Sequence, residues 1–261
     1  MIFKFLLRAY IFFIKRFYYF PSYNLDFHLN LQNNLFIKCF NCNYHHLNKR
    51  LLALKKSYPN YFNRMASDHL LIFLALSQTK INKILEIGTF DGKNIFLMSK
   101  IFKNYTQIRT IDLPDNHESF KNFYRRDNVD ARKKFIDDRN LVLSKIPNLI
   151  FSQISSVHLT QEKDKYDLIW LDGDHNYPIA CIDIINSLKL INKNGFIVCD
   201  DVYTEHIADP NIYESDATFD TLQILKKSGL IKLTLFYKRI DKLNNSYPKQ
   251  RKHVALIEKI Y

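Results

Sequence analysis

The sequence predicts an α/β protein built on an open, doubly wound sheet of mostly parallel strands, with a helical extension at the N-terminus. Short apolar, β-branched runs alternate with longer helix-compatible stretches from about residue 63 onward, a pattern typical of parallel sheets covered by helices on both faces. The last two apolar runs, joined by a polar loop, predict an antiparallel hairpin. With 261 residues, 47% of them hydrophobic, the chain can bury a substantial core.

The elements follow one another in a regular order. Five buried, parallel strands are expected at residues 84–87, 108–111, 149–153, 166–171 and 195–199. Helices are expected between them at residues 93–102, 120–143 and 177–191, and another within residues 63–80 leads into the first strand. After a helix near residues 218–227, the runs LIKLTLFYKRI and KHVALIEKI form the hairpin. The predicted sheet therefore has about seven strands.

Three segments divide the chain, namely residues 1–20, 21–62 and 63–261. Residues 1–20 predict an amphipathic helix with Lys4, Arg8 and Lys15 on one side. Its longest uncharged run is too short to cross a bilayer, so we expect it either to lie on an anionic membrane surface or to pack on the protein or on a second subunit. Residues 21–62 show no clear periodicity and predict an irregular connector or cap; residues 63–261 form the main domain.

Charge and cysteine content limit the function classes. The net charge is +12, but residues 1–60 hold nine Lys or Arg against one acid, so the main domain is only mildly basic and no specific nucleic-acid partner is expected. Four scattered cysteines indicate a reducing, cytoplasmic setting, at the inner face of a membrane if residues 1–20 attach there. The run CFNCNYHH has zinc-ligand residue types but the wrong spacing, which favours buried cysteines.

Two of the five glycines, Gly88 and Gly92, come directly after the first expected strand, in LEIGTFDG. Ligands of open α/β sheets bind beyond the carboxyl ends of strands, and Gly88 allows a sharp turn and close approach there while Gly92 lets the next helix pack tightly. The spacing differs from dinucleotide and P-loop motifs. The neighbouring acids Glu86 and Asp91 favour a cationic ligand over a pyrophosphate.

The motif LEIGTFDG resembles the first motif of class I S-adenosylmethionine (SAM) dependent methyltransferases, and the resemblance covers residues 68–261. It implies a Rossmann-like fold closed by the antiparallel hairpin, with SAM as cofactor. Glu86 would orient the methionine end and Asp112, in IRTIDLPD, would bind the ribose hydroxyls. The run SQISS departs from the family because it lacks the acid expected near the adenine. The positions expected to bind SAM are Glu86, Gly88, Thr89, Phe90, Gly92, Asp112, Ser155 (or Ser156) and Asp172.

Carboxylates follow two neighbouring strands, Asp172 in YDLIWLDGDHNY and Asp200 with Asp201 in GFIVCDDVY. Because parallel strands end at one edge, these acids should converge, and a divalent cation with a preference for oxygen would relieve their repulsion. The arrangement resembles metal-dependent O-methyltransferases of catechol, caffeoyl-CoA and macrolide-sugar type, which implies a metal, Mg²⁺ above all, held by Asp172, Asp200 and Asp201. The alternative is that Asp200 or Asp201 caps a turn and that Asp174 binds loop amides.

His175 follows Asp172 by three residues and is the candidate general base, with Asp172 beside it; the alternative is a loop histidine bonded to backbone. The sequence therefore predicts a SAM-dependent O-methyltransferase that acts on a hydroxyl of a small molecule or glycan with divalent-metal assistance. An RNA methyltransferase and a non-catalytic SAM-fold binding module are the alternatives. A homo-oligomer is left open.

Overall fold

The computed structural model describes most of the chain. It covers residues 25–62, 66–104, 106–122, 126–204, 216–238, 240 and 252–260, and the structural statements below concern these residues. The expected amphipathic helix at residues 1–20 lies outside them. None of the described helices is long and apolar enough to cross a membrane.

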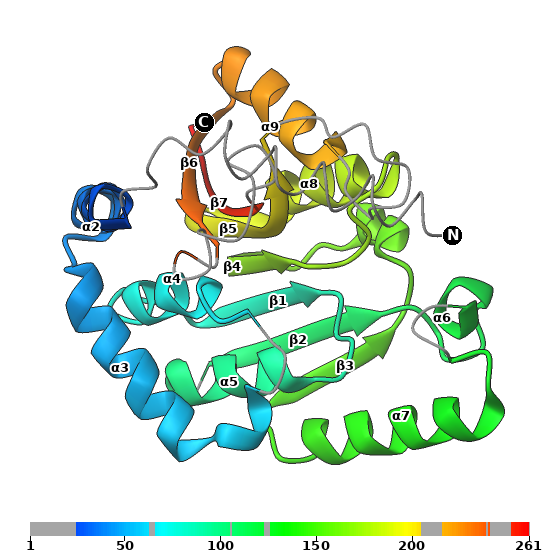
Figure 1. Ribbon diagram of the computed structural model, residues 1–261. Helices are drawn as coiled ribbons and strands as arrows, with labels where there is room; N and C mark the ends of the chain where they lie inside the picture. The colour runs from blue at the N-terminus through cyan, green and yellow to red at the C-terminus, as the bar shows by residue number, and fades with distance from the viewer. Residues whose placement is uncertain are drawn as a thin grey trace, which may run out of the picture.

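A seven-stranded sheet in the order β3-β2-β1-β4-β5-β7-β6 forms the centre of the molecule (Figure 1). Its strands are β1 (Lys83–Ile87), β2 (Gln107–Asp112), β3 (Leu149–Gln153), β4 (Tyr166–Leu171), β5 (Ile191–Tyr203), β6 (Ile231–Tyr237) and β7 (Lys252–Lys259). Strands β1 to β5 pair in parallel, and β7 is antiparallel to both β5 and β6. The predicted fold class and hairpin are confirmed. The strand order reverses between β1 and β4, where ligands of such sheets bind.

The helices differ from the sequence prediction at two places. They are α2 (Leu25–Phe40), α3 (Tyr44–Ser57), η1 (Pro59–Tyr61), α4 (His69–Leu76), α5 (Lys93–Ile101), α6 (Glu118–Asn122), α7 (Val129–Leu143), η2 (Ser156–Gln161), α8 (Ile179–Leu190) and α9 (Ala217–Lys227). The single helix expected over residues 120–143 is two helices, because Asn128 begins α7 by accepting a hydrogen bond from Ala131 N at 2.9 Å. The segment expected to be irregular, residues 22–58, contains α2 and α3.

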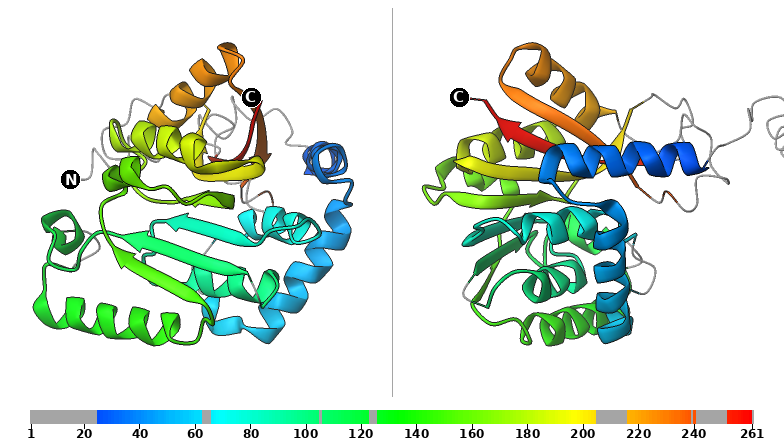
Figure 2. Two further views of the ribbon diagram at one scale, coloured as in Figure 1. Left: turned by 180° about the vertical axis from the view of Figure 1, so that it is seen from behind. Right: turned by 90° about the vertical axis from the view of Figure 1, so that its left-hand side faces the viewer.

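Helix α2 is stabilised by tertiary contacts that its sequence does not announce. Gln32 is buried and its side-chain amide pairs with the backbone of Tyr237 on β6, donating to the carbonyl at 3.2 Å and accepting from the N–H at 3.0 Å. The Phe36 ring packs against Phe236 on the same strand, with ring centroids 4.8 Å apart and the planes tilted by 53°. Figure 2 shows α2 beside β6, with α3 continuing along the same side of the sheet. The polar groups of the edge strand β6 are thereby covered in part.

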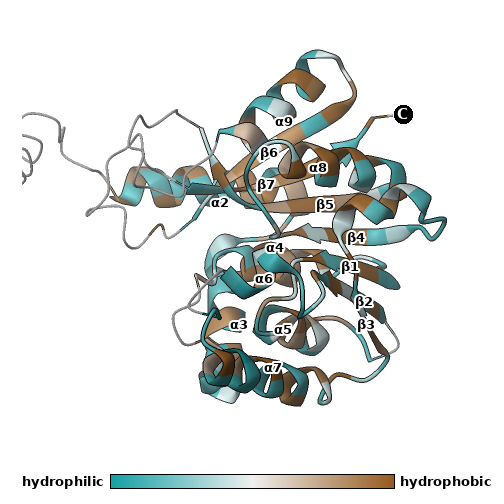
Figure 3. Cartoon of the chain, turned by 90° about the vertical axis from the view of Figure 1, so that its right-hand side faces the viewer, coloured by the Kyte–Doolittle hydropathy of each residue, from teal (hydrophilic) through white to brown (hydrophobic). Residues whose placement is uncertain are grey.

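The strands alternate their side chains between two hydrophobic cores. Ile84 and Trp170 belong to the core under α2, α3, α4 and α5. Leu85 and Ile169, one residue away on the same strands, belong to the core under α8 and α9. Figure 3 shows the hydrophobic residues concentrated along the strands. Helices cover both faces, so the polar loops at the strand ends are left to form the site.

Candidate functional site

The glycine turn after β1 is packed against the end of β4. Gly88 has a φ of +100°, and its N–H donates to Ile111 O on β2 at 2.9 Å. Asp172 N donates to Ile87 O at 2.9 Å, and a Cβ added to Gly88 would lie 2.2 Å from the backbone oxygen of Asp172. Only glycine fits this position. The turn and Asp172 therefore share one site at the switch point between β1 and β4.

Asp112, the last residue of β2, lies beside the same turn. One carboxylate oxygen accepts from Phe90 N at 2.8 Å, and the other accepts from Leu113 N at 2.8 Å. Burial raises the pKa of Asp112, although these two backbone N–H groups oppose the rise. Both oxygens are held in fixed directions, and the carboxylate is oriented before any ligand binds.

Gly92 begins α5 and serves helix packing. It has a φ of +74°, and a Cβ added there would lie 2.9 Å from Leu143 Cδ2 on α7 and 3.3 Å from Val142 Cγ1. Any side chain would push α7 away from the start of α5. The tight packing expected at this glycine is present.

Glu86 lies beneath the turn and is fully buried. Thr110 Oγ1 donates to one carboxylate oxygen at 2.6 Å, and Asn94 Nδ2 donates to the other at 2.8 Å. The hydroxyls of Thr89 and Thr110 are 2.7 Å apart, so the turn itself is tied to this carboxylate. Burial raises the pKa of Glu86 to about 8, with a further rise from the nearby charge of Asp172, while the two hydrogen bonds oppose it.

The network continues from Glu86 to α4. Asn94 Oδ1 is 2.8 Å from His69 Nε2, and the His69 ring stacks on Trp170 with centroids 4.8 Å apart. Burial lowers the pKa of His69 to about 4, so the ring is neutral at pH 7 and donates its Nε2–H to Asn94. Asn94, Thr110 and His69 were not identified from the sequence; the one available signal is that Asn94 lies in the first turn after Gly92.

At the end of β4, Asp172 is close to His175. The distance from His175 Nε2 to Asp172 Oδ1 is 3.6 Å. Burial away from water raises the pKa of Asp172 to about 6, and the charge of Asp200 adds to the rise. Burial would lower the pKa of His175, but the adjacent Asp172 raises it overall. The two residues that were expected to act together are therefore neighbours in the fold.

Two lysines form ion pairs with the acids near the end of β5. Lys238 Nζ is 2.6 Å from Asp200 Oδ2 and 2.5 Å from Asp201 Oδ1, and Lys252 Nζ contacts Asp201 Oδ2. Burial alone would raise the pKa of Asp201, but the two ammonium groups lower it below its usual range. Lys238 is itself buried, with 6% of its surface exposed.

These contacts decide how well the site fits a divalent metal. Asp200 and Asp201, two of the three expected ligands, offer their oxygens to lysine ammonium groups. Within the described residues, no group of three or more His, Cys, Asp or Glu side chains is placed to hold a metal ion. As placed, Asp172, Asp200 and Asp201 do not form a metal-ligand set.

The remaining sequence candidates make local contacts. Ser155 begins η2 after β3, and its hydroxyl accepts from Val157 N at 3.4 Å. Asp174 accepts two hydrogen bonds from Asn176, each 2.9 Å long, which fits the alternative of a loop-capping acid. Cys42 is buried and accepts a hydrogen bond from a glutamine side chain. The structure gives none of the three a contact with the turn.

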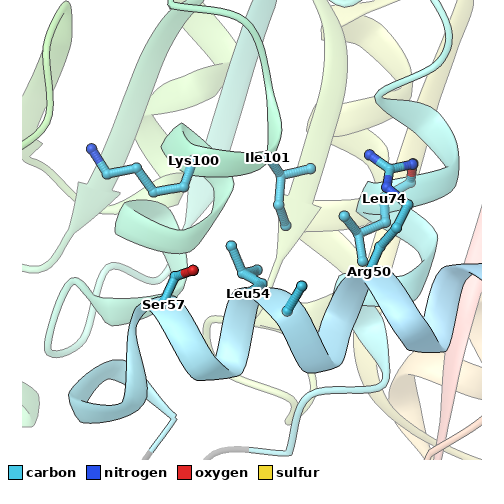
Figure 4. A pocket seen from close by; sticks show the side chains of 7 residues that line it. Arg50, Leu54, Ser57, Leu74, Lys100 and Ile101 are labelled. Carbon is cyan, nitrogen blue, oxygen red and sulfur yellow. The ribbon is translucent and has the colours of Figure 1, made fainter.

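A separate hollow of about 290 Å³ lies between α3 and the ends of α4 and α5 (Figure 4). It is lined by Arg50, Ala53, Leu54, Ser57, Leu74, Lys100 and Ile101. Ile101 is the last residue of α5, whereas Gly92 precedes the first. The hollow is therefore at the opposite end of α5 from the glycine turn and is not part of the site.

The comparisons with known proteins agree with this arrangement. Residues 85–202 match the model of a methyltransferase domain family. The uncharacterized protein R132 of Acanthamoeba polyphaga mimivirus is 29% identical over 178 residues, which are 62% of this chain and 73% of that protein.

Two solved structures show the same fold. An O-methyltransferase from Bacillus cereus in complex with S-adenosylhomocysteine (SAH) aligns with a TM-score of 0.51 and 14% identity, over 90% of this chain and all of that one. The O-methyltransferase TomG from Streptomyces achromogenes, in complex with SAM, aligns with a TM-score of 0.50 and 14% identity, over 91% of this chain and 99% of that one. The chain therefore has the fold of these methyltransferases, and its residues 85–202 match a methyltransferase domain, in agreement with the resemblance inferred from LEIGTFDG.

Proposed function

We propose that this protein is a SAM-dependent O-methyltransferase that transfers a methyl group to a hydroxyl of a small molecule or glycan. One observation carries the proposal: the glycine turn, the oriented carboxylate of Asp112 and the Asp172–His175 pair meet where the strand order reverses. The family match over residues 85–202 includes all of them. The two structures titled O-methyltransferases, one with SAH and one with SAM, support the choice of donor and of acceptor atom.

The residues present fit SAM. When bound, SAM supplies an electrophilic methyl group on a positively charged sulfonium. Gly88 lets the turn pass directly against the main chain of Asp172, which brings the turn and the end of β4 together at one site. Asp112 presents a carboxylate whose direction is fixed by two backbone N–H groups, suited to a pair of ribose hydroxyls. Glu86 is fully buried, so it acts by accepting hydrogen bonds from Asn94 and Thr110 beneath the turn, and not from the surface of the site.

His175 is our candidate for the group that takes the acceptor's proton. Its Nε2 faces Asp172, so the opposite ring nitrogen is the one available to a hydroxyl. When the methyl group leaves the sulfonium for the acceptor oxygen, with SAH as the leaving group, the imidazole of His175 would take the hydroxyl proton, and the carboxylate of Asp172 would stabilise the imidazolium that results. Divalent-metal assistance is left out of the proposal because Lys238 pairs with both Asp200 and Asp201.

The proposal is tested in two steps with the full chain. Isothermal titration calorimetry with SAM measures cofactor binding, and SAH release in the presence of hydroxylated glycans and polyphenols measures transfer, each with and without EDTA. His175→Asn should retain SAM affinity and lose most of the turnover, since a general base contributes about 10²–10⁴-fold. Absent SAM affinity would instead support a non-catalytic module, and turnover with RNA alone would support an RNA methyltransferase.

The N-terminal segment raises a separate proposal about location. Residues 1–20 combine three lysine or arginine positions on one helical side with a broad apolar face. We propose that they lie on an anionic membrane surface, which would place the acceptor near a membrane. Flotation of the full chain with vesicles containing anionic lipid tests this proposal; equal recovery with neutral vesicles would contradict it.

A further inference from the structure

The two acids near the end of β5, Asp200 and Asp201, point to one place because of an irregularity in that strand. Between Cys199 and Val202, β5 uses three steps where its partner β7 uses two, so β5 carries one extra residue. Asp201 within this bulge has a φ of +49°. Consecutive residues of a regular strand point to opposite faces, but the bulge lets Asp200 and Asp201 reach the same ammonium group.

That ammonium group is positioned by the C-terminal hairpin. Lys238 follows β6, and its backbone N–H donates to the carbonyl of Lys252, the first residue of β7, at 3.1 Å. The two lysines are therefore fixed next to each other. Asp200 is 5% exposed and Lys238 is 6% exposed, so water screens their attraction only weakly.

The ammonium group of Lys238 stands where a carboxylate-bound metal would need to stand. Its Nζ is 2.5–2.6 Å from one oxygen of each acid, about the spacing at which oxygens ligate a divalent cation. A metal ion cannot share those oxygens with the ammonium group without meeting its positive charge at short range. With Lys252, the two lysines supply two positive charges against the three negative charges of Asp172, Asp200 and Asp201.

We propose that Lys238 is the resident cation of this site, a positioning residue that takes the place of a divalent metal between Asp200 and Asp201, and that its removal frees the oxygens of these two acids for a divalent cation. The buried Asp200 Oδ1 has no hydrogen-bond partner within the described part of the chain, which leaves it available as a ligand in the variant. The inference concerns the site of the proposed methyl transfer, but its test measures metal binding and requires neither SAM nor a methyl acceptor.

The test is Mn²⁺ binding, followed by electron paramagnetic resonance of free Mn²⁺, on the full chain. The wild type should show no stoichiometric binding at millimolar Mn²⁺. Lys238→Met, which keeps an unbranched side chain one atom shorter and removes the charge, should bind one Mn²⁺ at least about 100-fold more tightly than the wild type because the repulsion is gone. Lys238→Met with Asp200→Asn should lose that site. The matched control Lys232→Met removes an exposed lysine of the preceding strand, paired with Glu258, and should bind as the wild type does.

Thermal unfolding gives a second readout. Lys238→Met should melt at a lower temperature than the wild type, because buried Asp200 loses its counterion and Asp201 keeps only Lys252. Mn²⁺ should raise the melting temperature of the variant but not of the wild type. Stoichiometric Mn²⁺ binding by the wild type that Asp200→Asn abolishes would overturn the proposal, and so would a folded Lys238→Met that gains no affinity. If Lys238→Met does not fold, the Mn²⁺ titration of the wild type still tests whether Asp200 and Asp201 are closed to a metal ion. SAM titration of the same samples reports separately on the proposed function.

Discussion

The replacement Gly88→Ala perturbs the contact on which the site depends. The alanine Cβ would lie 2.2 Å from the backbone oxygen and 2.6 Å from the backbone carbon of Asp172. Both are main-chain atoms of the end of β4, so no side chain can rotate away to relieve the overlap. The turn after β1 would have to move away from β4, and the backbone at a φ of +100° would be strained as well.

The expected cost follows from these two contributions. A positive φ costs a non-glycine residue about 1–2 kcal/mol, and overpacking in a tight interior adds about 1–3 kcal/mol. We therefore expect Gly88→Ala to lower the free energy of unfolding by about 2–5 kcal/mol. Gly229→Ala is the matched control, because Gly229 has a φ of +71° and nothing lies within 4 Å of an added Cβ. The loss of stability in Gly229→Ala should therefore contain only the cost of the positive φ, without any overpacking.

Urea unfolding followed by circular dichroism measures both variants, and calorimetry with SAM measures binding by the folded fraction. Gly88→Ala should lose at least about 1 kcal/mol more than Gly229→Ala and should bind SAM weakly, whereas Gly229→Ala should bind SAM as the wild type does. Equal losses of stability in the two variants, with SAM affinity unchanged, would refute the argument that glycine is required by the approach of β4.

Three further predictions concern charged groups. Burial raises the pKa of Glu86 in the folded protein to about 8 from an ordinary value of 4.5. The stability that its bound proton contributes is present below pH 4.5 and is lost as pH rises through 8, by at most about 5 kcal/mol. Glu86→Gln should flatten that dependence in urea unfolding at pH 5 and pH 9, and an unchanged slope would contradict it. Asp112→Asn should weaken SAM binding about 10–100-fold by calorimetry, since hydrogen bonds to charged groups contribute about 1.5–3 kcal/mol; unaltered affinity would exclude Asp112 as a ligand. Arg139→Met should cost about 3 kcal/mol, because Arg139 is 1% exposed and binds both oxygens of Asp115 at 2.8 and 3.0 Å, whereas exposed Lys134→Met should change stability by less than about 0.5 kcal/mol.

Local patterns in the sequence were sufficient for the sheet. The expected bounds of β3 and β4 agree with the structure, those of β1 and β2 extend by one residue or less at each end, and β5 is longer than expected. These strands can be recognised because most residues of each run are apolar or β-branched. Helices α2 and α3 were not predicted because their apolar spacing is irregular. Helix α2 packs on β6 through its buried Gln32, whose partner Tyr237 is 205 residues further along the chain.

The sequence alone determined the α/β class, the glycine turn after the first strand and the acids at the ends of the second, fourth and fifth strands, because each of these is a short-range pattern. The tertiary structure decided what those acids face. Asp200 is 38 residues from Lys238 and Asp201 is 51 residues from Lys252 in the chain, and the contacts depend on the hairpin register and on one extra residue in β5. Carboxylates that suggest a metal site in the sequence are therefore ion-paired with lysines in the fold, because the partner of a charge is set by three-dimensional neighbours and not by sequence spacing.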